Sequence, residues 1–101
     1  MDKQSKIACL GAHHIRCAEH AIGLDYHRNK PYIRHGKKFY RPYRNRFYTH
    51  MQDRTWLELK EVGLADHGKV SREDCVTFWL TREGLDWLGE QIGVYIHDES
   101  D

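Results

Sequence analysis

The chain has 101 residues, which is long enough for one domain with a small core, so we expect a single domain over residues 1–101. Its formal net charge of +1 hides an asymmetry, because residues 1–60 hold 13 Lys and Arg against 5 Asp and Glu, a net of +8, while residues 61–101 hold 3 against 10, a net of −7. Three cysteines exclude a paired disulfide framework and favour a reducing cytoplasm, and charged and histidine residues interrupt the apolar stretch 7–24, which excludes a signal peptide or a membrane span there.

The charge asymmetry has two interpretations. It is typical of a binding face on one part of a molecule and a solvated, repelling face on the other, or of two halves that partly neutralise each other in the fold. The first interpretation makes a polyanion the expected partner of the basic part. The sequence gives no indication of the oligomeric state.

Residues 6–22 have the spacing of a helix that ends at Gly23, with one face formed by Ile7, Leu10, Gly11, Ile15, Ala18 and Ile22. The opposite face carries the stripe Cys9, His13, Cys17 and His20. Histidine and cysteine one turn apart can share a zinc ion, but a stripe of three turns spans more than roughly 10 Å, and the chain has no C-x-x-C pair. The alternative is that these side chains pack under the basic segment, and we predict no metal and no cofactor.

Residues 26–50 form a basic segment in which cationic and aromatic residues interleave and no acidic residue occurs. Its cations are Arg28, Lys30, Arg34, Lys37, Lys38, Arg41, Arg44 and Arg46. Cations bind phosphates and flat rings can stack on bases, so this composition is typical of a nucleic-acid surface. The other interpretation of Tyr32, Phe39, Tyr40 and Tyr43 is that they cover the second face of a sheet, with the arginine side chains extending outward.

Within this segment, residues 31–40 read as a β-hairpin with a His35-Gly36 turn. Pro42 ends the second strand, and residues 43–50 are expected to run extended into the next helix. Residues 26–50 are therefore expected to be a basic hairpin insert.

The second half of the chain reads as a helix over 52–62 that ends at Gly63, a strand over 64–66, a polar loop, and a strand over 75–80. Thr81 is a good N-cap for a helix that runs to residue 92, followed by a short strand at 94–96 and an acidic tail at 97–101. The expected core contains Leu10, Ile15, Ile22, Leu59, Val62, Phe78, Leu80, Leu85 and Leu88.

Two short patterns carry a resemblance to winged-helix domains, in which a helix with a Gly-Leu ending precedes a two-stranded wing and a Leu-Thr-x-x-Gly helix. They are Leu57-Glu58-Leu59-Lys60-Glu61-Val62-Gly63-Leu64 and Phe78-Trp79-Leu80-Thr81-Arg82-Glu83-Gly84-Leu85. The resemblance implies an α+β, winged-helix-like fold of three helices and a two-stranded wing, here with the extra basic hairpin. Together with Glu19-His20-Ala21-Ile22-Gly23-Leu24 and Tyr43-Arg44-Asn45-Arg46-Phe47, the Gly-Leu step also resembles a group of small phage and prophage proteins.

The chain departs from the winged-helix pattern in two ways. A winged-helix DNA reader has two helices before the wing, the second of which enters the major groove, whereas this sequence has the basic hairpin in the place of one of them. The helix over 52–62 also carries Asp53, Glu58 and Glu61, which would repel phosphates. Groove reading by that helix is not expected.

Eight histidines invite a catalytic interpretation, yet no Gly-rich phosphate loop, G-x-S-x-G or H-E-x-x-H pattern is present. A nuclease that uses His27, His35 or His50 beside the arginines is an alternative to plain surface histidines. We predict that the protein is not an enzyme.

The sequence thus favours a nucleic-acid-binding module that contacts a phosphate backbone. The expected binding residues are Arg28, Lys30, Arg34, Lys37, Lys38, Tyr40, Arg41, Tyr43, Arg44 and Arg46. The alternative is a protein-interaction module, such as a phage-encoded inhibitor or modulator of a host protein, that docks on an acidic partner through the same basic face. No membrane partner is expected.

Overall fold

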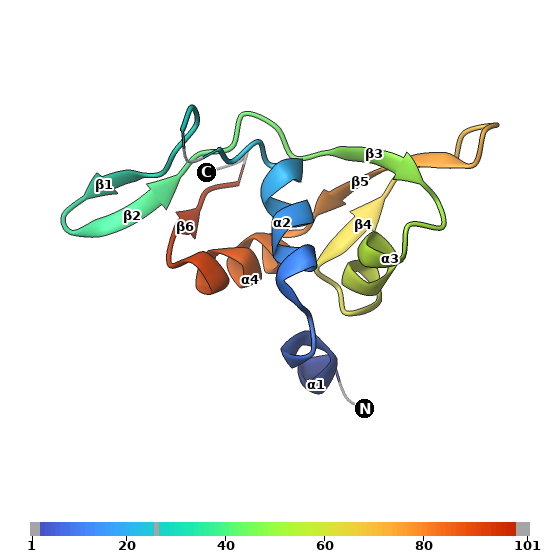
Figure 1. Cartoon of the computed structure of the whole chain (residues 1–101), viewed down its shortest axis with the longest axis horizontal. Coiled ribbons are helices and arrows are strands. Elements are labelled where there is room, and N and C mark those ends of the chain that lie inside the picture. Colours follow the sequence, from blue (N-terminus) through green and yellow to red (C-terminus); the bar gives the residue numbers. More distant parts are fainter. Residues whose placement is uncertain (1–2, 26, 99–101) are drawn as a thin grey trace.

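The computed structural model describes residues 3–25 and 27–98, so Tyr26 and the last three residues of the expected acidic tail lie outside the described residues. Figure 1 shows the elements in chain order, which are α1 (Lys3–Ala8), α2 (Ala12–Ala21), β1 (Tyr32–Arg34), β2 (Lys37–Tyr40), β3 (Phe47–His50), α3 (Arg54–Glu61), β4 (Ala65–His67), β5 (Cys75–Leu80), α4 (Arg82–Ile92) and β6 (Tyr95–Ile96). In the described residues these elements form an α+β domain of four helices and two small sheets, so the predicted fold class is confirmed at this level.

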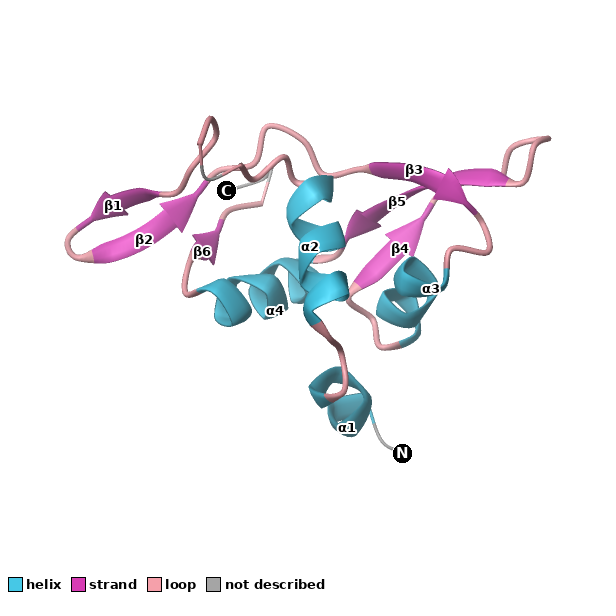
Figure 2. Ribbon diagram, in the orientation of Figure 1, coloured by secondary structure: helices cyan, strands magenta, loops and turns pink. Residues whose placement is uncertain are grey.

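The strands form two sheets, with the orders β1-β2-β6 and β3-β5-β4 (Figure 2). The expected hairpin over 31–40 is present as β1 and β2, and the short strand expected near 94–96 is present as β6, which runs parallel to β2. The expected two-stranded ribbon is a three-stranded sheet, because β3 pairs with β5 in the register Phe47 to Phe78. The extended stretch 43–50 therefore ends as a strand that places Phe47 toward the core.

The core lies between the β3-β5-β4 sheet and helices α2, α3 and α4. Trp56 is fully buried between Phe47 and Phe78, with ring centroids 5.4 and 5.5 Å apart. Most of the expected core residues are buried, namely Ile22, Leu59, Val62, Phe78, Leu80, Leu85 and Leu88. Leu10 and Ile15 were expected in the core as well, but they are only partly buried and pack at its edge.

The single helix expected over 6–22 is wrong, because the chain breaks between α1 and α2. Gly11 is extended, and its N–H donates to Nδ1 of His14 at 2.9 Å, so a side chain three residues ahead caps the start of α2. Glycine is also the poorest helix former after proline, which lowers the cost of a break there. The buried residues of α2 are His14, Ala18 and Ala21, which places a histidine where the periodicity had suggested only apolar side chains.

The two sequence patterns quoted for the winged-helix resemblance pack directly against each other. The Thr81 hydroxyl donates to the carbonyl of Gly63 at 2.8 Å and accepts the N–H of Gly84 at 3.1 Å, while the Thr81 N–H bonds the carbonyl of Leu64. A Cβ on Gly84 would lie 1.9 Å from that same Leu64 oxygen. The glycine is therefore required by the close approach of α4 to the Gly-Leu step.

The molecule is elongated, with principal extents of 46 × 32 × 24 Å. The β1–β2 hairpin forms one end of the long axis, and the loop between β4 and β5 forms the other, as Figure 1 shows. No helix among the described residues is both long enough and apolar enough to cross a membrane.

Candidate nucleic-acid interface

The β1–β2 hairpin sorts its residues onto two faces. His35 and Gly36 both have positive φ, of 53° and 77°, which is the backbone of the tight type I′ turn that suits a twisted hairpin. The register pairs Tyr32 with Phe39 and Arg34 with Lys37, so these four side chains share one face. Ile33, Lys38 and Tyr40 alternate onto the other face.

Strand β6 extends the first of these faces. Tyr95 pairs with Phe39, and the His97 ring packs nearly parallel to the Phe39 ring with centroids 5.9 Å apart. Tyr32 stacks on Phe39 from the neighbouring strand at 5.8 Å, and its hydroxyl lies 3.2 Å from Nε2 of His97. We call this surface the aromatic-basic face, and it consists of Tyr32, Arg34, Lys37, Phe39, Tyr95 and His97.

The rings of the aromatic-basic face are accessible at its two margins. Tyr32 on β1 is 41% exposed and Tyr95 on β6 is 49% exposed, whereas Phe39 between them is partly buried. Tyr95 stands edge-on to Phe39, and the Arg82 guanidinium lies 5.6 Å from its ring centroid. The surface therefore combines two exposed tyrosines with the cations of the hairpin.

Tyr40, one of the expected binding residues, is a core residue. It is 4% exposed, and its hydroxyl donates to the carbonyl of Ile22 at the end of α2 at 3.2 Å. Its neighbour in the register is Ile96, which is also buried. Tyr40 thus covers the core, as the second interpretation of the aromatic residues proposed, and its ring is not presented to a ligand.

Arg44, another expected binding residue, is used inside the fold. Its Nη2 donates to the carbonyl of His20 at 2.8 Å, so a cation caps the negative end of α2. Its guanidinium lies 5.4 Å from the Tyr43 ring, which in turn covers Gly23, where a Cβ would come within 2.4 Å of the ring. The pair Tyr43 and Arg44 therefore fastens the chain between the two sheets onto the end of α2.

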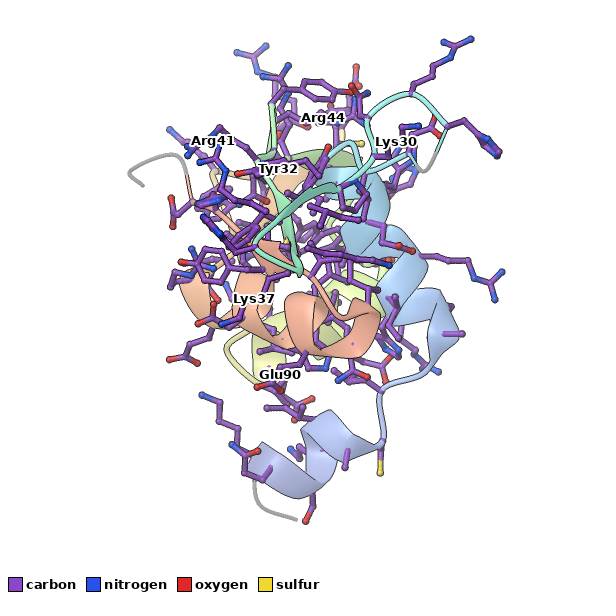
Figure 3. All side chains as sticks on the ribbon, turned by 90° about the vertical axis from the view of Figure 1, so that its left-hand side faces the viewer. Lys30, Tyr32, Lys37, Arg41, Arg44 and Glu90 are labelled. Atoms are coloured by element: carbon purple, nitrogen blue, oxygen red, sulfur yellow. The ribbon has the colours of Figure 1, made fainter. Side chains whose placement is uncertain are left out.

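The remaining expected cations are exposed, but they are distributed over the hairpin and the segments before and after it. Arg34, Lys37 and Lys38 lie on the hairpin, Arg41 follows β2, Arg28 and Lys30 lie in the loop before β1, and Arg46 lies before β3. We call the end of the long axis formed by β1 and β2 the hairpin end. Figure 3, which looks at this end, shows Lys30, Arg41 and Arg44 along its upper part and Lys37 below Tyr32, with Glu90 further down. The hairpin itself, residues 31–40, carries three cations and no acidic residue.

A hollow of about 540 Å³ lies above the end of α2 and is lined by Arg16, Arg28, Tyr43 and Arg44 together with Glu19 and Asp25. The N–H of His27 bonds the Asp25 carboxylate and lowers its pKa, which keeps a negative charge beside Arg28. Two carboxylates in the lining make this hollow less suited to phosphate than the hairpin, whose described residues are free of acids.

A second hollow, of about 550 Å³, lies beside the aromatic-basic face and is lined by residues 36–39 and 92–95. We call it the Phe39–Tyr95 groove. Lys37 and Lys38 lie on its β2 side, and the end of α4 forms the opposite wall. A Cβ on Gly93 in that wall would meet no heavy atom within 4 Å, so the backbone faces open space there.

Tyr95 and His97 were missed by the sequence analysis as site residues. Their signal was the alternation Val94-Tyr95-Ile96-His97, in which Val94 and Ile96 are buried, Tyr95 is exposed and His97 is partly buried. What the sequence could not show is the parallel pairing of β6 with β2, which joins residues more than fifty positions apart.

The stripe Cys9, His13, Cys17 and His20 does not form one surface, because Cys9 lies in the break between α1 and α2. Burial raises the pKa of the Cys17 thiol above its ordinary value of 9.0, and the negative charge of Asp53 adds to this effect, which disfavours the thiolate that zinc needs. The structure instead brings ligand atoms of His13, His14 and Glu58 within 4.8 Å of one another.

The bonding of the His14 ring argues against a metal at that second cluster. His14 is 3% exposed, and because its Nδ1 accepts the N–H of Gly11, the ring proton must be on Nε2, which faces Glu58 at 3.3 Å. A metal at Nε2 would require that proton to leave while Nδ1 keeps its bond, or the Gly11 cap to break. The cluster is accounted for as a helix cap and a hydrogen bond to α3.

The histidines considered for a nuclease are not gathered. His27 lies in the loop before β1, His35 is in the β1–β2 turn, and His50 ends β3 in the other sheet, on the opposite side of α2 from the hairpin in Figure 1. His50 lies 3.7 Å from the thiol of Cys75, its partner in the β3–β5 register.

Comparisons of the chain with protein-family models, with curated proteins and with solved structures found no match.

Proposed function

We propose that this domain binds nucleic acid through the hairpin end, with the cations of the aromatic-basic face on the phosphate backbone. The observation that carries the proposal is the hairpin register, which places Arg34 and Lys37 on the same face as Tyr32 and Phe39. Cations and exposed rings on one side of a small sheet supply the two contacts that nucleic acid needs, charge neutralisation and stacking.

The proposal keeps the winged-helix-like expectation for the rest of the chain. The order α3, Gly63-Leu64, β4, β5, α4 follows the pattern that the resemblance implies, and Thr81 and Gly84 pack on the Gly-Leu step. Reading of a groove by α3 is not part of the proposal, because the face that carries Glu58 and Glu61 is turned toward His14 of α2 and Lys6 of α1, and carboxylates repel phosphates. The phage or prophage origin stays an expectation from short patterns.

The test is the salt dependence of binding to a short fluorescein-labelled oligothymidylate, followed by fluorescence anisotropy. Each phosphate neutralised contributes a slope of about −0.7 to −0.9 to the plot of log affinity against log salt. The double variant Arg34→Gln/Lys37→Gln is expected to weaken binding of all sequences about equally and to flatten this slope by roughly one to two units.

A matched control removes the same charge from the other end of the molecule. Lys69 and Arg72 are exposed in the loop between β4 and β5, and Lys69→Gln/Arg72→Gln is expected to leave the affinity and the slope close to those of the parent. Equal effects of the two double variants would show that binding follows net charge and not the hairpin.

One observation favours the alternative of a protein partner. Ile33 is 70% exposed on β1, which is an edge strand of its sheet, and an exposed edge can pair with an added strand. The test is a pull-down after nuclease treatment with the parent and with Ile33→Glu. A protein partner that binds the parent and not the variant, while both bind oligothymidylate equally, would assign the hairpin to protein docking.

A further inference from the structure

The Phe39–Tyr95 groove differs chemically from the basic surface around it. One side is formed by residues 36–39 at the start of β2, and the other by residues 92–95 at the end of α4 and the start of β6. The lining thus includes aromatic and aliphatic residues, and its lysines, Lys37 and Lys38, belong to the β2 side only. This combination suits a flat, largely apolar group that is attached to a negative chain.

The end of α4 decides which part of a nucleotide can enter. The C-terminus of a helix carries a partial negative charge, and α4 has no basic residue in its last turn to offset it. A phosphate is therefore disfavoured beside the end of α4 and favoured on the β2 side of the groove, at Lys37, and beyond it at Arg34. A base, which is neutral and carries an amino or a ring N–H donor (the ring N–H in thymine), meets no such penalty beside the helix carbonyls.

Stacking on this surface requires an unpaired base. In a duplex each base already stacks on its neighbours and presents only its edges in the grooves, so a protein ring cannot reach its flat face. The exposed rings of Tyr32 and Tyr95 lie at the margins of a small sheet, a setting in which unpaired bases can be received.

We infer that the Phe39–Tyr95 groove receives an unpaired base of single-stranded nucleic acid, whose backbone phosphates lie on Lys37 and Arg34. This inference rests on the proposed function and gives it a substrate class. It makes Tyr95 a binding residue. The Tyr95 ring contacts the base, and the hairpin cations contact the phosphates.

The test compares oligothymidylate with an abasic oligonucleotide of the same length, which keeps the phosphates and lacks the bases. The parent protein is expected to bind oligothymidylate about 5- to 150-fold more tightly, the range that base stacking on an aromatic ring contributes. Tyr95→Leu is expected to remove most of this ratio and leave the salt slope unchanged. Arg34→Gln/Lys37→Gln is expected to weaken both ligands and flatten the slope.

The matched control for Tyr95→Leu is Tyr48→Leu, which replaces another exposed tyrosine on β3 in the other sheet. It is expected to keep the ratio of the parent. A second measurement needs no variant: ring protons of Phe39 and Tyr95 in the parent should shift in NMR spectra with oligothymidylate and stay in place with the abasic ligand.

The outcomes separate the two claims. The base-binding groove would be overturned, and phosphate binding left intact, if the parent bound both ligands equally with a steep salt slope. The same conclusion would follow if Tyr95→Leu kept the affinity ratio of the parent and the ring protons of Phe39 and Tyr95 did not shift. Absence of salt-dependent binding to either ligand would overturn the proposed function, and the inference with it.

Discussion

Phe39 and Tyr40 are adjacent on β2, and strand alternation gives them opposite environments. Phe39 packs among the rings of the aromatic-basic face, while Tyr40 is buried and its hydroxyl donates to the Ile22 carbonyl. Composition alone assigned Tyr40 to the binding surface, because it counts aromatic residues without their direction. The direction follows only once the hairpin register and the pairing of β2 with β6 are known.

The burial of Tyr40 makes a prediction about pH. Burial, reinforced by Tyr43 and opposed by Arg44, raises the pKa of the Tyr40 hydroxyl above its ordinary value of 10.0. The folded protein then holds this proton more tightly than the unfolded chain, so the stabilisation is complete below about pH 10 and is lost as the pH rises toward the folded pKa.

Tyr40→Phe removes that hydroxyl. At neutral pH we expect the variant to lose about 0.5–1.5 kcal/mol of unfolding free energy, the usual net value of one hydrogen bond. Above about pH 10 the difference between the two proteins should shrink, because only the parent can lose the proton. Chemical denaturation at a series of pH values measures this, and a constant difference across the series would contradict the assignment.

At the scale of elements, the sequence predicted what depends on local chemistry. The His35-Gly36 turn, the Thr81 cap and the alternation of β5 were all expected and all occur. The break in the first helix was not, because it depends on a bond from Gly11 to a histidine side chain that periodicity treats as helical. The pairing of β3 with β5 and of β6 with β2 was also missed, since non-local pairing leaves no local pattern.

The same limit applies to the candidate site. The basic hairpin was predicted from composition, and its exposed cations agree with that expectation. The role of Arg44 as a cap on α2 and the position of Tyr95 beside Phe39 both depend on contacts between distant segments. The sequence could therefore predict which segment is basic and exposed. It could not show which residues of that segment stabilise the fold, as Arg44 does, and which are exposed to solvent.

The His14 cap leads to a prediction about α2. His14→Ala removes the acceptor of the Gly11 N–H and is expected to cost about 0.5–2 kcal/mol, as for other helix caps. His13→Ala, at the exposed neighbouring position, is the control and should change the melting temperature little. Because Nδ1 of His14 is occupied, zinc or a chelator should leave the melting temperature of the parent unchanged. A rise with zinc that His14→Ala abolishes would show a metal site at His14.

At the scale of the whole molecule, ion pairs between the two halves of the sequence account for part of the charge asymmetry. The ion pairs Lys3–Glu83, Lys6–Glu61 and Lys60–Asp66 join the basic half of the sequence to the acidic half. All three lysines lie outside the segment 26–50. Neutralisation thus operates around α1 and α3, while the hairpin end stays basic at one extremity of the long axis (Figure 3).

The most direct test of nucleic-acid binding by the hairpin end is an NMR titration of the ¹⁵N-labelled protein with oligothymidylate at low salt. Amide shifts are expected to change in residues 32–41 and 92–97, at one end of the molecule, and to return toward their free values when salt is added. The loop 68–74 at the opposite end should be unaffected. Shifts confined to that loop, or no salt-dependent shifts at all, would contradict the proposed function.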